Sequence, residues 1–214
     1  GSRALSIPST AQITEGRILV QGNQFRSFTG SAIFLGTSNY HLTARENEFY
    51  ACVTAIDVGE YADCTISDNN FYAAASGTSY YVKTQAQHTW ILNNYFIPGG
   101  ATGGADVWVY AASANSGYVW IDGNKFGNES ENSARNKVYI SAGATSYVPP
   151  RIDLTRNNFL GVASQTAIKV DAFTQGLRIA GNWFQGFTTL INDNAPAPVS
   201  ASQFRYGENI FRDN

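Results

Sequence analysis

The stretch WILNNYF (residues 90–96) places two asparagines between an apolar run and a phenylalanine. Its ending, Asn-x-Phe, occurs eight times in the chain, and successive copies lie 22 to 33 residues apart. Self-similarity at such a period is typical of proteins built from stacked repeats. The asparagines of the eight copies are Asn23, Asn47, Asn69, Asn94, Asn124, Asn157, Asn182 and Asn209.

Apolar residues spaced two apart flank most copies of the motif, and a spacing of two is the period of a β-strand. Before Asn124, for example, Val119 and Ile121 alternate with polar or outward positions. After each phenylalanine and a loop of variable length, a second pair follows, which we expect to point inward. These pairs are Ile33/Leu35, Ile56/Val58, Tyr80/Val82, Val107/Val109, Val138/Ile140, Ile168/Val170 and Leu190/Asn192.

Each unit thus contains three short strands, and such a unit buries its apolar face only when it stacks on its neighbours. A β-propeller needs about 40 residues per blade, and a leucine-rich repeat needs a leucine consensus that these units do not have. Over residues 17–214 the chain resembles the right-handed parallel β-helix of the pectate-lyase type. The resemblance predicts an all-β solenoid of about eight coils with three strands per coil. We expect residues 1–16 to be a cloning scar (Gly1-Ser2) followed by an N-terminal leader or cap.

The motif residues have structural roles in such a solenoid. Asparagine tolerates the left-handed backbone conformation that a sharp bend between two strands requires. Stacked about 4.8 Å apart, the asparagine amides can bond to one another or to buried backbone groups. The phenylalanines are expected to form an aromatic stack inside the coils.

The composition excludes several classes of function. Only 14% of the residues are charged and the formal net charge is −2, so no basic surface for nucleic acid is expected. No apolar run is long enough for membrane insertion. Cys52 and Cys64 are expected to be buried thiols, with a disulfide as the minority alternative. His41 and His88 are isolated, and we expect no metal and no cofactor.

Because the motif residues are structural, function must come from outward positions and loops. In the strand after the variable loop the expected outward residues form a column, with Tyr81, Trp108 and Tyr139 on consecutive coils. Rings beside charged groups suit a carbohydrate, because a sugar has apolar C–H faces for the rings and hydroxyls for the charged groups. The predicted substrate-binding set is Tyr81, Trp108, Tyr139, Asp106, Lys137 and Lys169, with Lys83 and Asp171 nearby. The alternatives are a stacked ladder that only stabilises the strands and a subunit contact. The full outward column is Phe34, Asp57, Tyr81, Trp108, Tyr139, Lys169 and Ile191.

A second outward face precedes the asparagine bends. Trp90, Leu92 and Trp120 lie on adjacent coils and predict an exposed apolar patch. Such a patch is more typical of a protein interface than of a sugar site. We interpret it as the contact of a homotrimer.

Glycosidases use two carboxylates, so paired acidic residues are candidates for catalysis. Asp171 and Asp193 are predicted to occupy equivalent outward positions on successive coils, where one carboxyl would be pushed towards protonation. Rival combinations involve Asp57, Asp106 and Glu60. The alternative for each is a solvated acidic surface.

The chain is most similar to bacteriophage tailspikes, which are trimeric β-helices that bind and often cleave bacterial surface polysaccharides. The resemblance implies an extracellular receptor-binding domain of a virion tail that recognises a bacterial surface polysaccharide, with endoglycosidase activity as one expectation. Two alternatives remain open. One is a non-catalytic adhesin or structural β-helix of a phage appendage. The other is a polysaccharide lyase or epimerase, for which Lys83, Lys137 and Lys169 would neutralise a uronate.

Overall fold

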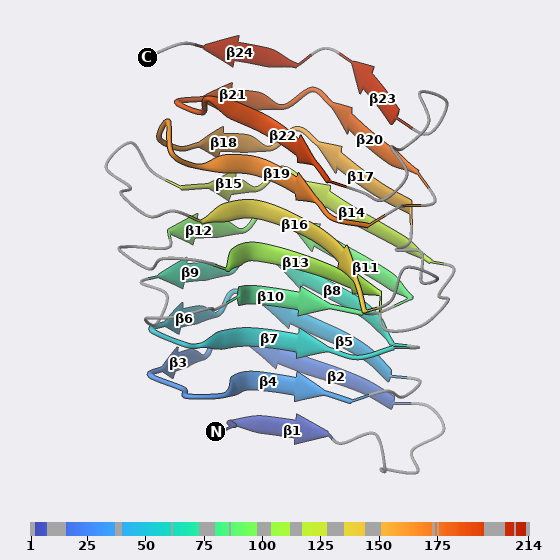
Figure 1. The fold of residues 1–214 in the computed structure, drawn as a ribbon. Helices are drawn as coiled ribbons and strands as arrows, with labels where there is room; N and C mark the ends of the chain where they lie inside the picture. Colours follow the sequence, from blue (N-terminus) through green and yellow to red (C-terminus); the bar gives the residue numbers. More distant parts are fainter. Residues whose placement is uncertain are drawn as a thin grey trace.

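The computed structural model describes residues 3–7, 16–36, 40–60, 62–72, 80–85, 87–97, 104–111, 117–127, 135–143, 151–172, 174, 176–194, 204–207 and 209–212. The regular structure of these residues consists of 24 strands in three sheets, and no helix is found among them. All strand pairs are parallel, and each strand pairs with strands three places away in chain order, so the chain winds as a right-handed parallel β-helix (Figure 1).

The coils stack from β1 at one end to β24 at the other (Figure 1). The first sheet contains β1 (Leu5–Ile7), β4 (Ser31–Leu35), β7 (Thr54–Val58), β10 (Tyr80–Thr84), β13 (Ala105–Ala111), β16 (Asn136–Ala142), β19 (Thr166–Val170) and β22 (Thr189–Asp193). The second contains β2 (Gly16–Gln21), β5 (Tyr40–Arg45), β8 (Asp63–Ser67), β11 (His88–Leu92), β14 (Tyr118–Asp122), β17 (Arg151–Thr155), β20 (Leu177–Ala180) and β23 (Phe204–Gly207). The third contains β3 (Gln24–Arg26), β6 (Glu48–Tyr50), β9 (Asn70–Tyr72), β12 (Tyr95–Ile97), β15 (Lys125–Phe126), β18 (Asn158–Leu160), β21 (Trp183–Gln185) and β24 (Ile210–Arg212).

The predicted fold is confirmed, with eight strands in each sheet. β1 pairs with β4, so the first sheet includes a strand from the segment that was expected to be a leader or cap. Cys52 and Cys64 are free and buried, in agreement with the sequence.

The asparagines form a continuous ladder along the corner between the second and third sheets. Asn94 is typical: its Nδ2 donates to Asn124 Oδ1 (3.0 Å) and to the carbonyl of Ile66 (2.8 Å). Its Oδ1 accepts from the backbone N–H and the Nδ2 of Asn69, both at 3.0 Å. The predicted amide bonds are thus confirmed, but the ladder asparagine is not the left-handed residue. That conformation belongs to the residue before it, such as Asn93 with φ 54° or Gly123 with φ 67°.

The phenylalanines form the predicted interior stack. Neighbouring rings from Phe25 to Phe184 lie 4.7 to 5.0 Å apart and within 9° of parallel. Together with the inward aliphatic residues of all three sheets they fill one core that runs the length of the solenoid.

The inward pairs differ from the prediction on two coils. Val82 and Thr84, not Tyr80 and Val82, align with the inward pair of β7. On β22, Ile191 and Asp193 align with Ile168 and Val170, so the register differs from the prediction by one residue. Leu190 still packs against the core, as predicted, whereas Asn192 aligns with the outward residue Lys169. The one-residue shift on β22 follows from a bend in this sheet at which two consecutive residues are buried, as Ala167 and Ile168 are, so the alternation of two breaks there.

Candidate functional site

The outer face of the first sheet carries the chemistry-bearing side chains in two neighbouring columns. Strand register brings Asp57, Lys83, Trp108, Tyr139 and Lys169 into the first column. The second column lies two residues further along each strand. It contains Gln85, Tyr110, Ser141, Asp171 and Asn194.

Trp108 is the centre of this face, and its indole is packed from several sides. The ring stacks on Tyr80 at 4.3 Å and faces Tyr139 at 6.0 Å between centroids, while Tyr110 lies 4.8 Å away, tilted by 50°. The indole N–H donates to Ser141 Oγ at 2.8 Å. The stacked aromatic ladder, which was the alternative to a carbohydrate site, is therefore present. Tyr110 is the ring whose plane departs from this stack.

Asp171 organises the end of the face nearer the C-terminus. Tyr139 Oη donates to Asp171 Oδ2 (2.9 Å), Lys169 Nζ lies 2.8 Å from the same oxygen, and Asn194 donates to Oδ1 (3.3 Å). Burial alone would raise the pKa of Asp171, but the hydrogen bonds from Lys169, Tyr139 and Asn194 lower it below the usual aspartate value. Asp171 is therefore an ionised acceptor at neutral pH and is unsuited to act as a proton donor.

Asp57 and Lys83 occupy the opposite end of the same face. Lys83 Nζ lies 3.9 Å from Asp57 Oδ1, and Ser31 Oγ donates to Asp57 Oδ2 at 3.5 Å. Burial raises the pKa of Asp57, although Lys83 and Ser31 act to lower it. Lys83 also lies over two rings, 5.0 Å from the centroid of Trp108 and 5.6 Å from that of Tyr110. Its ammonium thus joins the acidic end to the aromatic centre.

Three residues of the predicted substrate-binding set lie elsewhere. Tyr81, Asp106 and Lys137 are buried at the bend of the first sheet, so their predicted outward orientation is wrong. Arg135, also fully buried, lies 3.1 Å from Asp106 Oδ1, and Lys137 Nζ lies 3.9 Å from the other carboxylate oxygen. The arginine also lies over the ring of Tyr81, at 5.3 Å from its centroid. These groups form an internal ionic cluster beneath the face.

The predicted carboxylate pair is not formed as expected. Asp193 aligns with Val170, and the residue beside Asp171 on the last coil is Asn194, so Asp171 and Asp193 are not equivalent. Glu60 lies two residues after β7 and is half-buried. No hydrogen bond to its buried Oε1 is found within the described part of the chain. Among the described residues, no three His, Cys, Asp or Glu side chains gather as a metal site would require.

The expected interface residues lie on the outer face of the second sheet. Trp90 and Trp120 stack face to face at 5.2 Å, and Tyr118 packs on Trp120 at 4.2 Å. Leu92 lies in the same sheet, two residues beyond Trp90 and beside Asp122. All three predicted residues are partly exposed, and the trimer itself stays a prediction.

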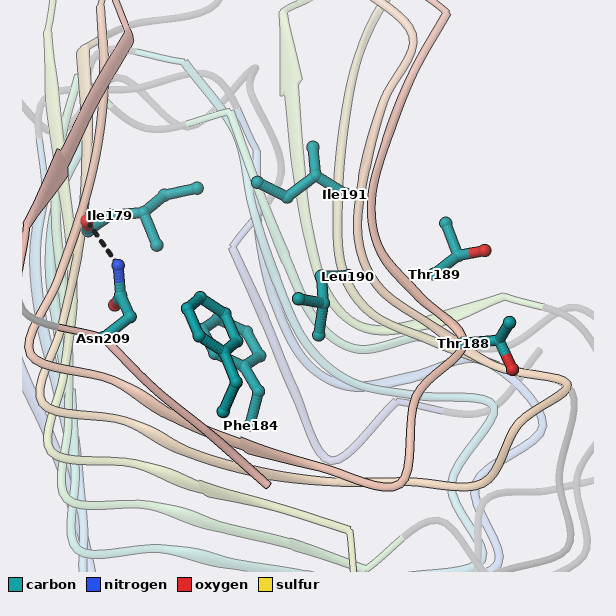
Figure 2. A pocket seen from close by; sticks show the side chains of 8 residues that line it. Ile179, Phe184, Thr188, Thr189, Leu190, Ile191 and Asn209 are labelled. Atoms are coloured by element: carbon teal, nitrogen blue, oxygen red, sulfur yellow. Dashed lines mark hydrogen bonds between the residues drawn. The ribbon is translucent and has the colours of Figure 1, made fainter. Parts of the chain in front are cut away.

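A pocket of about 360 Å³ lies at the C-terminal end of the solenoid, among side chains of the last two coils (Figure 2). Ile179, Phe184 and Ile191 point towards it, and Asn209 donates to the carbonyl of Ile179 at its side. Phe184 and Phe211 are 5.7 Å apart here, wider than the other pairs of the stack. The pocket is partly open, since the exposed residues Thr188, Thr189 and Phe211 help to line it, and it contains none of the predicted site residues.

Comparisons with protein-family models, with curated proteins and with solved structures find no match to this chain. Within the described residues, no helix has the length and apolarity to cross a membrane.

Tyr110 and Ser141 lie on the face without having been predicted, and Lys83, which was expected as a charged neighbour of the column, lies within it. The signal that finds Tyr110 and Ser141 is the strand period, because each lies two residues after a predicted outward residue, Trp108 or Tyr139. Placing Lys83 in the column required the correct register of β10, which the two adjacent tyrosines of that strand obscure.

Proposed function

We propose that the protein binds a polysaccharide along the outer face of the first sheet. The observation that carries this proposal is the contiguous run of rings, hydroxyls and charged groups from Lys83 to Asp171, which follows the solenoid axis for three coil steps, or about 14 Å. A linear glycan is itself extended, with apolar C–H faces and many hydroxyls. An extended row of aromatic and polar side chains matches it better than a compact pocket would.

The side chains of this face are held in place before any ligand binds. The indole of Trp108 is fixed by Ser141, and the phenol of Tyr139 by Asp171. Ordering side chains on binding costs about 0.5–1.5 kcal/mol each, and prior ordering avoids this cost. Because most ring faces are already packed, ligand contact with the edges of Trp108 and Tyr139 and with the tilted ring of Tyr110 is expected.

Binding without cleavage fits the carboxylates of this face best. Asp57 and Asp171 lie on coils four steps apart, which corresponds to about 19 Å. Glycosidases place their two carboxyl groups about 5 to 9.5 Å apart. The resemblance to tailspikes makes bacterial surface polysaccharides the first ligands to test.

The test uses one variant on the face and a matched variant on another face. Tyr110 and Tyr95 are both half-buried tyrosines with a lysine over the ring, Lys83 at 5.6 Å and Lys125 at 4.7 Å. Wild type, Tyr110→Ala and Tyr95→Ala are titrated with a panel of capsule and O-antigen polysaccharides. We expect Tyr110→Ala to weaken binding by about tenfold, the effect of one lost ring contact, and Tyr95→Ala to leave it unchanged.

Equal binding by both variants, or no binding by wild type to any polysaccharide, would refute the proposal. The same incubations are assayed for new reducing ends and for the absorbance of unsaturated uronates. These readouts detect the hydrolase and lyase alternatives directly.

A second candidate function is self-association through the second sheet, favoured by the partly exposed stack of Trp90, Trp120 and Tyr118. Arg151 lies over Tyr118 at 4.9 Å and extends this surface with a charge. A homotrimer would be detected by sedimentation equilibrium, and Trp120→Ala would shift it towards the monomer. A monomer at all concentrations would exclude this candidate.

A further inference from the structure

The four lysines of the chain differ in what their ammonium groups contact. Lys137 is buried beside Asp106, and Lys169 is held by Asp171 at 2.8 Å. Lys125 lies on the third sheet, away from the proposed binding face. Lys83 lies on that face, 3.9 Å from the nearest carboxylate oxygen, beyond the distance of a hydrogen bond.

The ammonium of Lys83 therefore retains hydrogen-bonding capacity. An ammonium group has three donors, and no hydrogen bond of Lys83 is found within the described part of the chain. Its contacts with the rings of Trp108 and Tyr110 hold the charge above the aromatic centre of the face. The side chain is about one-quarter exposed, so a ligand that lies on these rings can reach it.

We propose that Lys83 makes this face selective for acidic polysaccharides, by binding a carboxylate of a sugar that lies against Trp108 and Tyr110. This inference rests on the proposed function and specifies its ligand class. A carboxylate accepts charge-assisted hydrogen bonds, which are stronger than those of a neutral hydroxyl. The partial burial of Lys83 strengthens this difference, because a less hydrated charge is less screened by solvent.

Lys169 provides the internal comparison. It lies on the same face, over the ring of Tyr139 at 4.9 Å, but its ammonium is engaged by Asp171. Each lysine has an aspartate beside it that would repel a second carboxylate, but only Asp171 already occupies its lysine at hydrogen-bond distance, at 2.8 Å against 3.9 Å for Asp57. The two lysines are thus similar in type and setting and differ in whether the charge is already neutralised at hydrogen-bond distance.

The experiment compares each acidic polysaccharide of the panel with its carboxyl-reduced form, which is neutral and otherwise has the same sugars and linkages. For wild type we expect at least about a tenfold loss of affinity on reduction, the effect of one charge-assisted hydrogen bond. Lys83→Gln should bind the acidic and reduced forms equally. Lys169→Gln should keep the preference for the acidic form.

Each outcome decides the proposal. If wild type binds the reduced forms as tightly as the acidic forms, the selectivity is refuted while polysaccharide binding stands. If Lys83→Gln keeps the full preference, the assignment to Lys83 is wrong. If no polysaccharide binds in either form, the proposed function fails and the selectivity fails with it. Circular dichroism spectra identical to those of wild type show that both glutamine variants are folded.

Discussion

Replacing Asn94 by alanine tests whether the asparagine ladder stabilises the fold. The Asn94 side chain makes four hydrogen bonds inside the solenoid: it donates to Ile66 and to Asn124, and it accepts two from Asn69. Alanine removes all four, and it leaves the Ile66 carbonyl and the backbone N–H of Asn69 buried without these partners. The perturbation therefore acts on both neighbouring coils.

The expected cost follows from the number of bonds. At about 1 kcal/mol of net stability per hydrogen bond, four bonds amount to about 4 kcal/mol. The end of the ladder provides a control, because Asn23 is exposed and its amide donates to Gln21 (2.9 Å) and, more weakly, to Asn47 (3.3 Å). Solvent can replace these bonds, so Asn23→Ala should cost about 1 kcal/mol or less.

The assay is urea unfolding followed by both far-ultraviolet circular dichroism and tryptophan fluorescence. Two probes are needed because stacked repeats can unfold in parts, and only coincident transitions justify a single free energy of unfolding. If Asn94→Ala and Asn23→Ala lower the free energy of unfolding by the same amount, the buried ladder has no special role in stability. A loss of the cooperative transition in Asn94→Ala alone would support the ladder, since the break lies in the middle of the stack.

Two further predictions concern the proposed binding face. The raised pKa of Asp57 means that the folded state binds its proton more tightly than the unfolded chain, so ionisation of this residue destabilises the fold as the pH rises through that raised pKa. Asp57→Asn should therefore raise the urea midpoint at pH 7, and the difference from wild type should vanish below the ordinary aspartate pKa of 3.8; a lower midpoint at pH 7 would contradict this. Trp108→Ala removes the contacts with Tyr80 and Tyr139 and the bond to Ser141, so it should cost about 2 kcal/mol of stability as well as binding. Unfolding like that of wild type would show that the rings are not structural.

The interior of the solenoid was predictable because every coil repeats the same Asn-x-Phe motif at the same position. Asn94 and Phe96 recur with the same spacing in all eight units, and stacking places each copy on the one before. Loop length does not disturb this column, since the motif itself defines the register. The left-handed residue of the turn between the second and third sheets was predicted one residue too late. Asparagine tolerates the left-handed conformation at any turn position, and this tolerance does not distinguish Asn93 from Asn94.

The outer face was harder to predict because it lies after the variable loop. Because β10 begins with two tyrosines, its inward residues can be assigned two positions too early, since a shift of two preserves the alternation of inward and outward side chains. Thr84 is the true inward residue, and it is polar because it shares a buried hydrogen bond with Thr89 (2.8 Å). A pattern that expects an apolar residue at this position therefore selects Tyr80 instead.

The misplacement of Asp106 and Lys137 has a different cause, and the sequence contains a signal against it. Both residues occupy the bend position that is filled by Ala32, Ala55 and Ala167 on other coils. Three alanines at one position of a repeat indicate limited space, which is a property of the interior and not of an exposed column. Charged residues at such a position imply partners within the protein, as Arg135 is for Asp106. In a solenoid, the small residues of neighbouring coils are thus a better guide to whether a charge is buried than the alternation within its own strand.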